Sequence, residues 1–177
     1  MSRDMYRKLL ILIILAAPLV ARADSLGSLA GPAGMLQPVD RVVVHKAKRL
    51  MELYREDAVV ASFKVSLGLV PIGQKQREGD YRTPEGRYRL TRRNAQSDFF
   101  LAVQVSYPEP ADVALARRNG WAPGGAIMVH GLPNQLKYSR DRYLSTDWTD
   151  GCIALSNEDM LDFWLLTGNG TPIEIRP

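Results

Sequence analysis

Short apolar stretches separated by turn residues dominate the pattern of hydrophobic and polar positions in the C-terminal four-fifths of the chain. The stretches are rich in Val, Ile, Phe and Tyr, and Gly, Pro and Asp residues interrupt them. Stretches of this length and composition predict β-strands. The predicted strands are residues 41–45, 58–67, 88–91, 99–106, 126–130 and 172–176.

Two segments have the pattern of a helix instead. Residues 111–119 form a short one that Gly120 ends. Ser156 precedes the second and is an N-cap candidate, with Asp159 placed to reach back. Four residues then share one helical face, which we expect to pack on the sheet: Met160, Phe163, Trp164 and Thr167. The elements together predict a mainly β domain.

The first 23 residues have the pattern of a secretory signal peptide. Arg3, Arg7 and Lys8 precede an apolar run from Leu9 to Val20, and Ala21-Arg22-Ala23 then provides a cleavage site. A transmembrane anchor is the alternative, but the run is shorter than the ~20 residues that span a bilayer. We therefore expect export, with no stable membrane span after cleavage.

Cleavage after Ala23 changes the charge balance. The full chain has 23 Lys and Arg residues against 19 Asp and Glu residues, and the signal segment carries four of the former and one of the latter. The mature chain would keep 19 basic and 18 acidic residues, a net charge of +1, which does not support a nucleic-acid partner. Residues 24–37 are a small, Gly-rich, flexible lead-in, so that residues 38–177 form one domain.

Cys152 is the only cysteine of the chain and lies in the sequence TDGCIALSN. A lone cysteine in an exported protein indicates a reactive thiol, an intermolecular disulfide or a buried, inert side chain. The preceding Gly151 lets the backbone approach a substrate closely. The amides of Gly151 and Cys152 are then candidates to stabilise an oxyanion.

His130 is the stronger of two candidate bases for this thiol. It ends the predicted strand 126–130 and enters a long loop, where site residues are common, whereas His45 lies within a strand. The loop, residues 131–148, is long enough to be a functional lid. Its aromatic and basic residues could clasp a polar polymer: Tyr138, Arg140, Arg142, Tyr143 and Trp148. One cysteine and two distant histidines make no metal-ligand set, so we expect no metal.

The segment His130-Gly131, a long spacer and Thr149-Asp150-Gly151-Cys152 resembles the signature of the L,D-transpeptidase catalytic domain family (YkuD type). Three further stretches resemble the family: VSLGLVPIGQKQREGDYRTPEGRYRL, GGAIMVHG and GTPIEIRP. The resemblance covers roughly residues 40–177. It implies a β-sandwich of two mixed sheets with short helices.

The resemblance also implies an enzyme of bacterial peptidoglycan. Family members attack the carbonyl of the third stem-peptide residue with a cysteine, release a D-amino acid and pass the acyl group from a thioester to an amine. By position, Cys152 is the nucleophile, His130 the general acid/base, and Gly151 and Cys152 the oxyanion amides. The candidate substrate-binding residues are Gly131, Tyr138, Trp148, Thr149 and Asp150. No cofactor is implied, and the periplasm of a Gram-negative bacterium is the expected compartment.

Two departures from the family pattern leave the acyl acceptor open. Asp150 replaces the usual histidine, and Ala154 and Leu155 stand where many members have Arg or Asn. This version resembles a divergent branch in which at least one member is associated with hydrolytic release of a lipoprotein from peptidoglycan rather than with cross-linking. Three functions follow: an L,D-transpeptidase; an L,D-carboxypeptidase or amidase that uses water and has an envelope lipoprotein as partner; and a non-catalytic peptidoglycan-binding domain.

Asp150 itself has three interpretations. An extended backbone would place its side chain on the same side as Cys152, where a carboxylate raises the thiol pKa. Asp150 could orient a protonated His130, as in a Cys-His-Asp triad. It could instead accept the ammonium group of diaminopimelate, or cap a turn through its own backbone amides.

Overall fold

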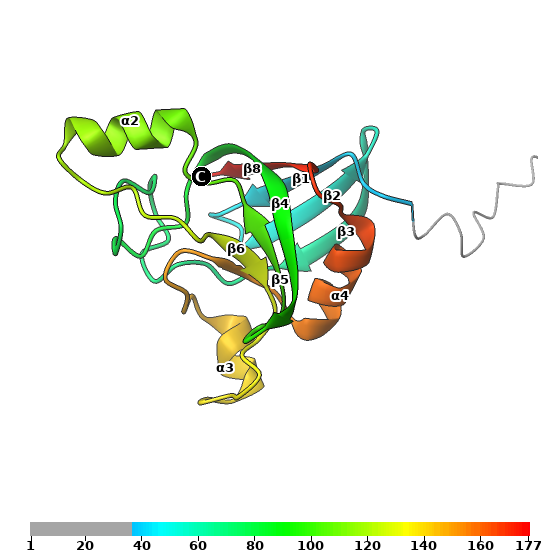
Figure 1. Cartoon of the computed structure of the whole chain (residues 1–177). Coiled ribbons are helices and arrows are strands. Elements are labelled where there is room, and N and C mark those ends of the chain that lie inside the picture. Colours follow the sequence, from blue (N-terminus) through cyan, green and yellow to red (C-terminus); the bar gives the residue numbers. More distant parts are fainter. Residues whose placement is uncertain (1–36) are drawn as a thin grey trace, which may run out of the picture.

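Strands outweigh helices in residues 37–177, the part of the chain that the computed structural model describes (Figure 1). The predicted signal peptide and residues 24–36 of the predicted lead-in lie outside the described residues. The strands are β1 (Arg41–His45), β2 (Leu50–Arg55), β3 (Ala58–Lys64), β4 (Gly86–Ser97), β5 (Phe100–Val105), β6 (Met128–His130), β7 (Ile153–Ala154) and β8 (Pro172–Arg176). The helices are α2 (Pro110–Arg118), α3 (Arg140–Ser145) and α4 (Asn157–Leu166).

The strands are hydrogen-bonded in the order β3-β2-β1-β8-β4-β5-β6-β7. Each half of this ladder is mixed, because β1 runs parallel to β8 and β6 runs parallel to β7, whereas the other pairs are antiparallel. The long β4 belongs to both halves and its register with β5 shifts twice, which bends it (Figure 1). The predicted mainly β fold with mixed sheets is therefore confirmed, with β4 as the strand that the two sheets share.

The core lies where the two halves and α4 meet. Val42 and Val44 of β1, Leu90 of β4 and Val105 of β5 are fully buried. Burial of a side chain of this size stabilises a fold by about 1.5–3 kcal/mol. The apolar positions that predicted these strands are thus the positions that hold the sheet together.

Helix α4 begins at its predicted N-cap, Ser156, and buries residues of its predicted face. Ser156 accepts a hydrogen bond from the amide of Asp159 at 3.0 Å, and Met160 and Phe163 are fully buried. Its last carbonyls find a partner on the sheet, since Arg93 of β4 donates to the carbonyl oxygens of Trp164 and Thr167. The helix is therefore capped locally at its N-terminus and held to β4 at its C-terminus.

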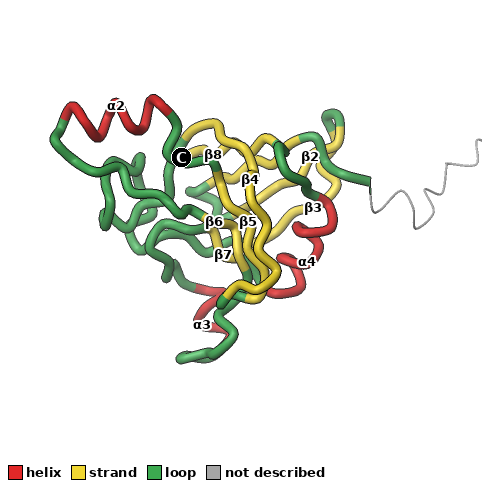
Figure 2. Tube along the Cα trace, viewed as in Figure 1, coloured by secondary structure: helices red, strands yellow, loops and turns green. Residues whose placement is uncertain are grey.

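The connections differ more from prediction than the strands do. Helix α3 and strands β2 and β7 were not predicted, and the predicted strand 126–130 begins only at Met128. Figure 2 shows that the long loops gather beside β6 and β7, between α2 and α3. None of the helices in residues 37–177 is long and apolar enough to cross a membrane.

Candidate active site

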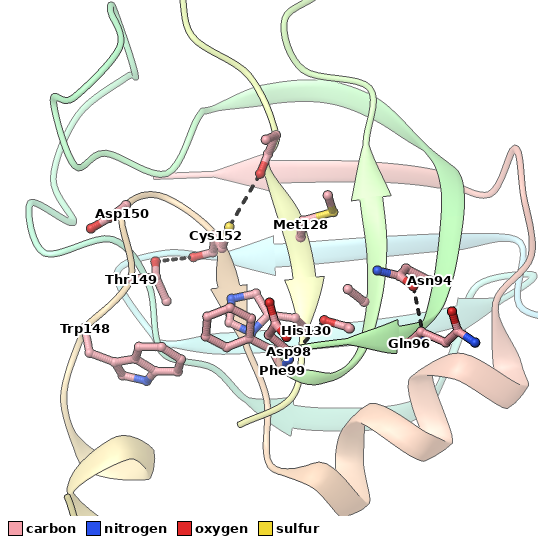
Figure 3. A pocket seen from close by; sticks show the side chains of 13 residues that line it. Asn94, Gln96, Asp98, Phe99, Met128, His130, Trp148, Thr149, Asp150 and Cys152 are labelled. Carbon is pink, nitrogen blue, oxygen red and sulfur yellow. Dashed lines mark hydrogen bonds between the residues drawn. The ribbon is translucent and has the colours of Figure 1, made fainter. Parts of the chain in front are cut away.

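His130 ends strand β6 and Cys152 lies directly before strand β7, which runs parallel to β6. In this pairing Val129 lies opposite Ile153, and His130 lies opposite Ala154. Both side chains line one cavity of about 430 Å³ (Figure 3). Two residues that are 22 positions apart in the sequence thus face the same space because their strands pair.

His130 is held as a neutral base. Its Nδ1 lies 2.7 Å from the carbonyl oxygen of Gly131, and because a carbonyl only accepts, Nδ1 carries the proton and Nε2 keeps its lone pair. Burial of the ring, which is 4 % exposed, lowers the pKa of His130 to about 4, although the Gly131 carbonyl acts against this shift. The ring is consequently uncharged at neutral pH and able to accept a proton.

Two aromatic rings fix the plane of the imidazole. The ring of Phe99 lies 4.6 Å from that of His130, between centroids, and the ring of Trp148 lies 5.6 Å away in an edge-on arrangement. Trp148 is itself fixed, because its Nε1 donates to the carbonyl oxygen of Tyr143 at 3.1 Å. Phe99 was not predicted as a site residue. In the structure it marks the site as a large apolar side chain that is 36 % exposed at the tip of the β4–β5 hairpin.

The thiol of Cys152 is protonated in this arrangement. Its Sγ lies 3.7 Å from the carbonyl oxygen of Ala126 and is directed at it (Figure 3). Burial raises the pKa of Cys152 and the charge of Asp150 adds to the shift, whereas the Met128 backbone and Lys75 act against it. The resting pair is therefore a neutral thiol and a neutral imidazole. A protonated thiol needs a base to take its proton before it can act as a nucleophile, and the neutral His130 lines the same cavity.

Thr149 and Gly151 shape the loop that carries the thiol. The Oγ1 of Thr149 donates to the carbonyl oxygen of Cys152 at 2.8 Å and accepts from the amide of Gly151 at 3.1 Å. Gly151 has a φ of +128°, and a Cβ there would lie 2.7 Å from the carbonyl oxygen of Arg82, so only glycine fits. Because the Gly151 amide is bonded to Thr149, the Cys152 amide is the better of the two predicted oxyanion donors.

Asp150 is exposed at the mouth of the cavity. Its side chain points away from His130 in Figure 3, and the pKa of His130 carries no contribution from it. It does act on the thiol, whose pKa it raises. Of the three interpretations of Asp150, this geometry disfavours a triad with His130.

Two of the predicted substrate-binding residues do not line this cavity. A Cβ on Gly131 would lie 2.7 Å from Oδ1 of Asn157 and 3.0 Å from Cβ of Phe100, so this glycine allows close packing behind the site. Tyr138 is 54 % exposed and lines a separate groove with Arg142. The sequence grouped them with the site because they neighbour its motifs along the chain. Trp148, Thr149 and Asp150 do line the cavity.

The β4–β5 hairpin supplies the other side of the cavity. Asn94, Gln96, Ser97 and Asp98 line it together with Phe99 (Figure 3). No sequence motif marked these residues, because short polar side chains near a turn are common. Among the described lining residues, the charged ones are Asp98 and Asp150. The cavity is therefore suited to a cationic part of a ligand.

The departure at position 154 lies outside the cavity. Ala154 lines a separate space of about 100 Å³ with Lys64 and Leu132, and its backbone pairs with Ser66. Within residues 37–177, no group of three or more His, Cys, Asp or Glu side chains is arranged to hold a metal ion.

Comparison with known proteins places this geometry in a family. Residues 39–175 match the model of the family described as YkuD: L,D-transpeptidase catalytic domain. A curated relative, "Putative L,D-transpeptidase YafK" of Escherichia coli (strain K12), is 27 % identical over 174 residues, which cover 90 % of this chain and 63 % of the relative.

Solved structures agree with the match. The helical cell shape determining protein Pgp2 from Campylobacter jejuni aligns with a TM-score of 0.59 and 28 % identity, over 78 % of this chain and 48 % of that one. Bd1075 of Bdellovibrio bacteriovorus aligns with a TM-score of 0.55 and 22 % identity, over 79 % of this chain and 51 % of that one, and shows the shared fold. The chain thus spans about half the length of these neighbours and under two thirds of the curated relative.

Proposed function

This chain belongs to the L,D-transpeptidase catalytic domain family, and from that membership we propose that it is an exported cysteine enzyme that acts on peptidoglycan stem peptides through a thioester on Cys152. The observation that carries the proposal is the shared cavity of Cys152 and His130, in which the imidazole is neutral and the thiol lies beside open space. The alternative of a non-catalytic binding domain gives no reason for a base held in this way. The name of Pgp2 connects that protein with cell shape, which supports a role in cell-wall remodelling here.

The first half of the reaction forms the thioester. Rotation of the Cys152 side chain away from the Ala126 carbonyl brings the thiol toward Nε2 of His130, which takes its proton as Sγ attacks the carbonyl carbon of the third stem-peptide residue. The carbonyl electrons move to oxygen, and the Cys152 amide donates to that oxyanion. His130 then gives the proton to the departing nitrogen, the C–N bond breaks, and a D-amino acid leaves.

The second half transfers the acyl group. An amine of another stem peptide attacks the thioester carbonyl while Nε2 of His130 takes one of its protons. The C–S bond breaks, the sulfur recovers the proton from His130, and a new amide bond remains. Water in place of the amine gives a carboxylic acid by the same steps, which is the carboxypeptidase or amidase alternative.

Asp150 has a recognition role in this proposal. It is exposed at the cavity that holds Cys152, and Asp98 lies on the opposite hairpin. The described residues that line the cavity include these two carboxylates and no Lys or Arg, so the cavity attracts an ammonium group, and the third residue of the stem peptide, diaminopimelate, carries one. The like charge that Asp150 places near the thiol is offset when that ammonium is bound.

Product analysis tests the proposed reaction. The mature protein is mixed with defined tetrapeptide muropeptides, with and without a second stem peptide as amine donor, and with a muropeptide that carries a linked lipoprotein fragment. Mass spectrometry should show a cross-linked product and a released D-amino acid. If the tripeptide muropeptide is the only product even when the amine donor is present, the hydrolytic alternative is favoured.

Matched variants show whether the proposed residues carry the reaction. Cys152→Ser and His130→Gln should both lose it. His45→Gln is the control, because His45 is hydrogen-bonded to Glu52 on the sheet, away from the cavity, and should keep full activity. Activity retained in His130→Gln and lost in His45→Gln would overturn the assignment of the base.

A further inference from the structure

A second groove lies beside the Cys152 cavity. It has a volume of about 390 Å³ and is lined by Leu69, Tyr138, Arg142, Asp147 and Trp148, among others. Trp148 lines both spaces, so that the two adjoin at this residue. We call this space the Arg142 groove.

Hydrogen bonds fix the Arg142 groove relative to the nucleophile. The amides of Trp148 and Thr149 both donate to the carbonyl oxygen of Leu67, and the amide of Leu69 donates to that of Thr149 at 2.9 Å. The ring of Tyr143 packs edge-on against Trp148, with 4.9 Å between centroids. A ligand in the groove therefore lies at a defined distance from the loop that carries Cys152.

The groove presents one available cation on an apolar surface. The Arg142 guanidinium lies 4.1 Å from the ring centroid of Tyr138, an arrangement that orients the side chain through a cation–π contact. Leu69 and Tyr138 are 55 % and 54 % exposed. The acidic residue of the groove, Asp147, is already occupied, because it forms hydrogen bonds with the guanidinium of Arg49 at 3.0 and 2.7 Å.

Arg142 is not occupied in this way. Within the part of the chain that the structure describes, its guanidinium takes part in no ion pair. A planar guanidinium held by stacking, with its N–H groups toward solvent, is suited to a carboxylate.

The charges of the two spaces are opposite. The cavity of Cys152 carries Asp98 and Asp150, whereas the groove offers Arg142. A ligand with an ammonium group at one end and a carboxylate at the other would match both spaces at once. A stem peptide has this pattern, because the residue before its diaminopimelate is a D-glutamate with a free α-carboxylate.

We infer that the stem peptide crosses Trp148, with the D-glutamate α-carboxylate on Arg142 and the reacting third residue in the cavity of Cys152. Arg142 is thus a specificity-determining residue for acidic rather than amidated stem peptides. This inference rests on the proposed function, because it takes a stem peptide as the substrate.

Steady-state kinetics with two tetrapeptides tests the inference. One carries the free D-glutamate α-carboxylate and the other carries its amide; otherwise they are identical. Arg142→Gln should raise KM for the acidic peptide about five- to tenfold, the size expected of a partly exposed charge-assisted hydrogen bond, with kcat little changed. For the amidated peptide, wild type and Arg142→Gln should have the same, higher KM.

The control is Arg118→Gln on α2. Arg118 is exposed and lines neither the Arg142 groove nor the cavity of Cys152, so this variant should keep the wild-type KM for both peptides. An Arg142→Gln variant with unchanged KM, or with KM raised equally for both peptides, would overturn the inference while the proposed function stands. A folded wild-type protein that turns over neither peptide would overturn both.

Discussion

Thr149 bridges two backbone groups of the loop that carries Cys152: its Oγ1 donates to the carbonyl oxygen of Cys152 at 2.8 Å and accepts from the amide of Gly151 at 3.1 Å. Thr149 is 4 % exposed and Gly151 is buried, so the Gly151 amide has no water as a substitute partner. One hydroxyl thereby determines where the sulfur and the Cys152 amide lie relative to His130.

Removing this hydroxyl should slow the reaction. Thr149→Val keeps the shape but removes the partner of the buried Gly151 amide and of the part-buried Cys152 carbonyl, at a cost of about 1–3 kcal/mol in the free energy of unfolding. We expect acylation to slow by at least about tenfold, since the loop loses its fixed geometry. Thr149→Ser retains the hydroxyl and should keep most of the rate. Thermal unfolding and single-turnover acylation measure the two effects; equal rates in the Val and Ser variants would contradict this role.

Gly151 should tolerate no side chain. A Cβ at this position would lie 2.7 Å from the carbonyl oxygen of Arg82, and the φ of +128° is strained for any other residue. We expect Gly151→Ala to lose about 1–3 kcal/mol or more of stability, together with the thiol reactivity. Gly168→Ala is the control, because a Cβ there meets nothing within 4 Å, and its stability should change by at most about 1 kcal/mol. Denaturant unfolding measures the free energy of unfolding of both variants, and an equal change in the two would contradict the prediction.

The strands were predictable from sequence because their cause is local. Strands β1, β5 and β8 coincide with runs of β-branched and aromatic residues, most of which are buried in the structure. The Ser156 cap of α4 is likewise a contact between residues close together in the sequence. β2 was missed, although its burial alternates over Leu50–Leu53, because Glu52 and the charged residues around it weaken the signal. Helix α3 was missed because its six residues include a single buried side chain, Tyr143.

The site was predictable only where a motif carried it. Cys152 and His130 were predicted from the lone Gly-Cys, the strand end and the motif, and their shared cavity follows from the pairing of β6 and β7. Phe99, which holds the imidazole, comes from a hairpin 31 residues before His130, and no short-range pattern connects the two. The bond from the Gly151 amide to Thr149 likewise depends on a loop conformation that composition does not specify.

Acid should destabilise the protein through His130. Burial lowers the pKa of this ring to about 4, below the value of about 6.5 for an unfolded chain. The unfolded state therefore takes up a proton first as the pH falls, and stability is lost between about pH 6.5 and 4, up to about 3 kcal/mol. The stability is fully present above that window. Denaturant unfolding from pH 4 to 7 measures the loss, and His130→Gln should lack this component; an unchanged pH dependence in that variant would refute it.

Asp150→Asn should affect the thiol and substrate choice differently. Removal of the negative charge lowers the pKa of Cys152, so alkylation by iodoacetamide at neutral pH should become modestly faster. The KM for stem peptides with a free diaminopimelate amine should rise by several-fold, because the ammonium loses a partner. Peptides whose amine is acetylated should show no such rise. Alkylation slowed by the substitution, or KM raised equally for both peptides, would contradict the recognition role.

The central claim is that Cys152 forms a thioester with the stem peptide after His130 takes its proton. Intact-protein mass spectrometry of acid-quenched mixtures with a defined tetrapeptide tests it most directly, with peptide digestion to locate the adduct. The account predicts a mass increase equal to the tripeptide acyl group, located on Cys152, with one D-amino acid released per adduct, and no adduct in folded Cys152→Ser or His130→Gln protein. An adduct of equal amount in the His130→Gln variant, or turnover of the tetrapeptide by Cys152→Ser, would contradict it.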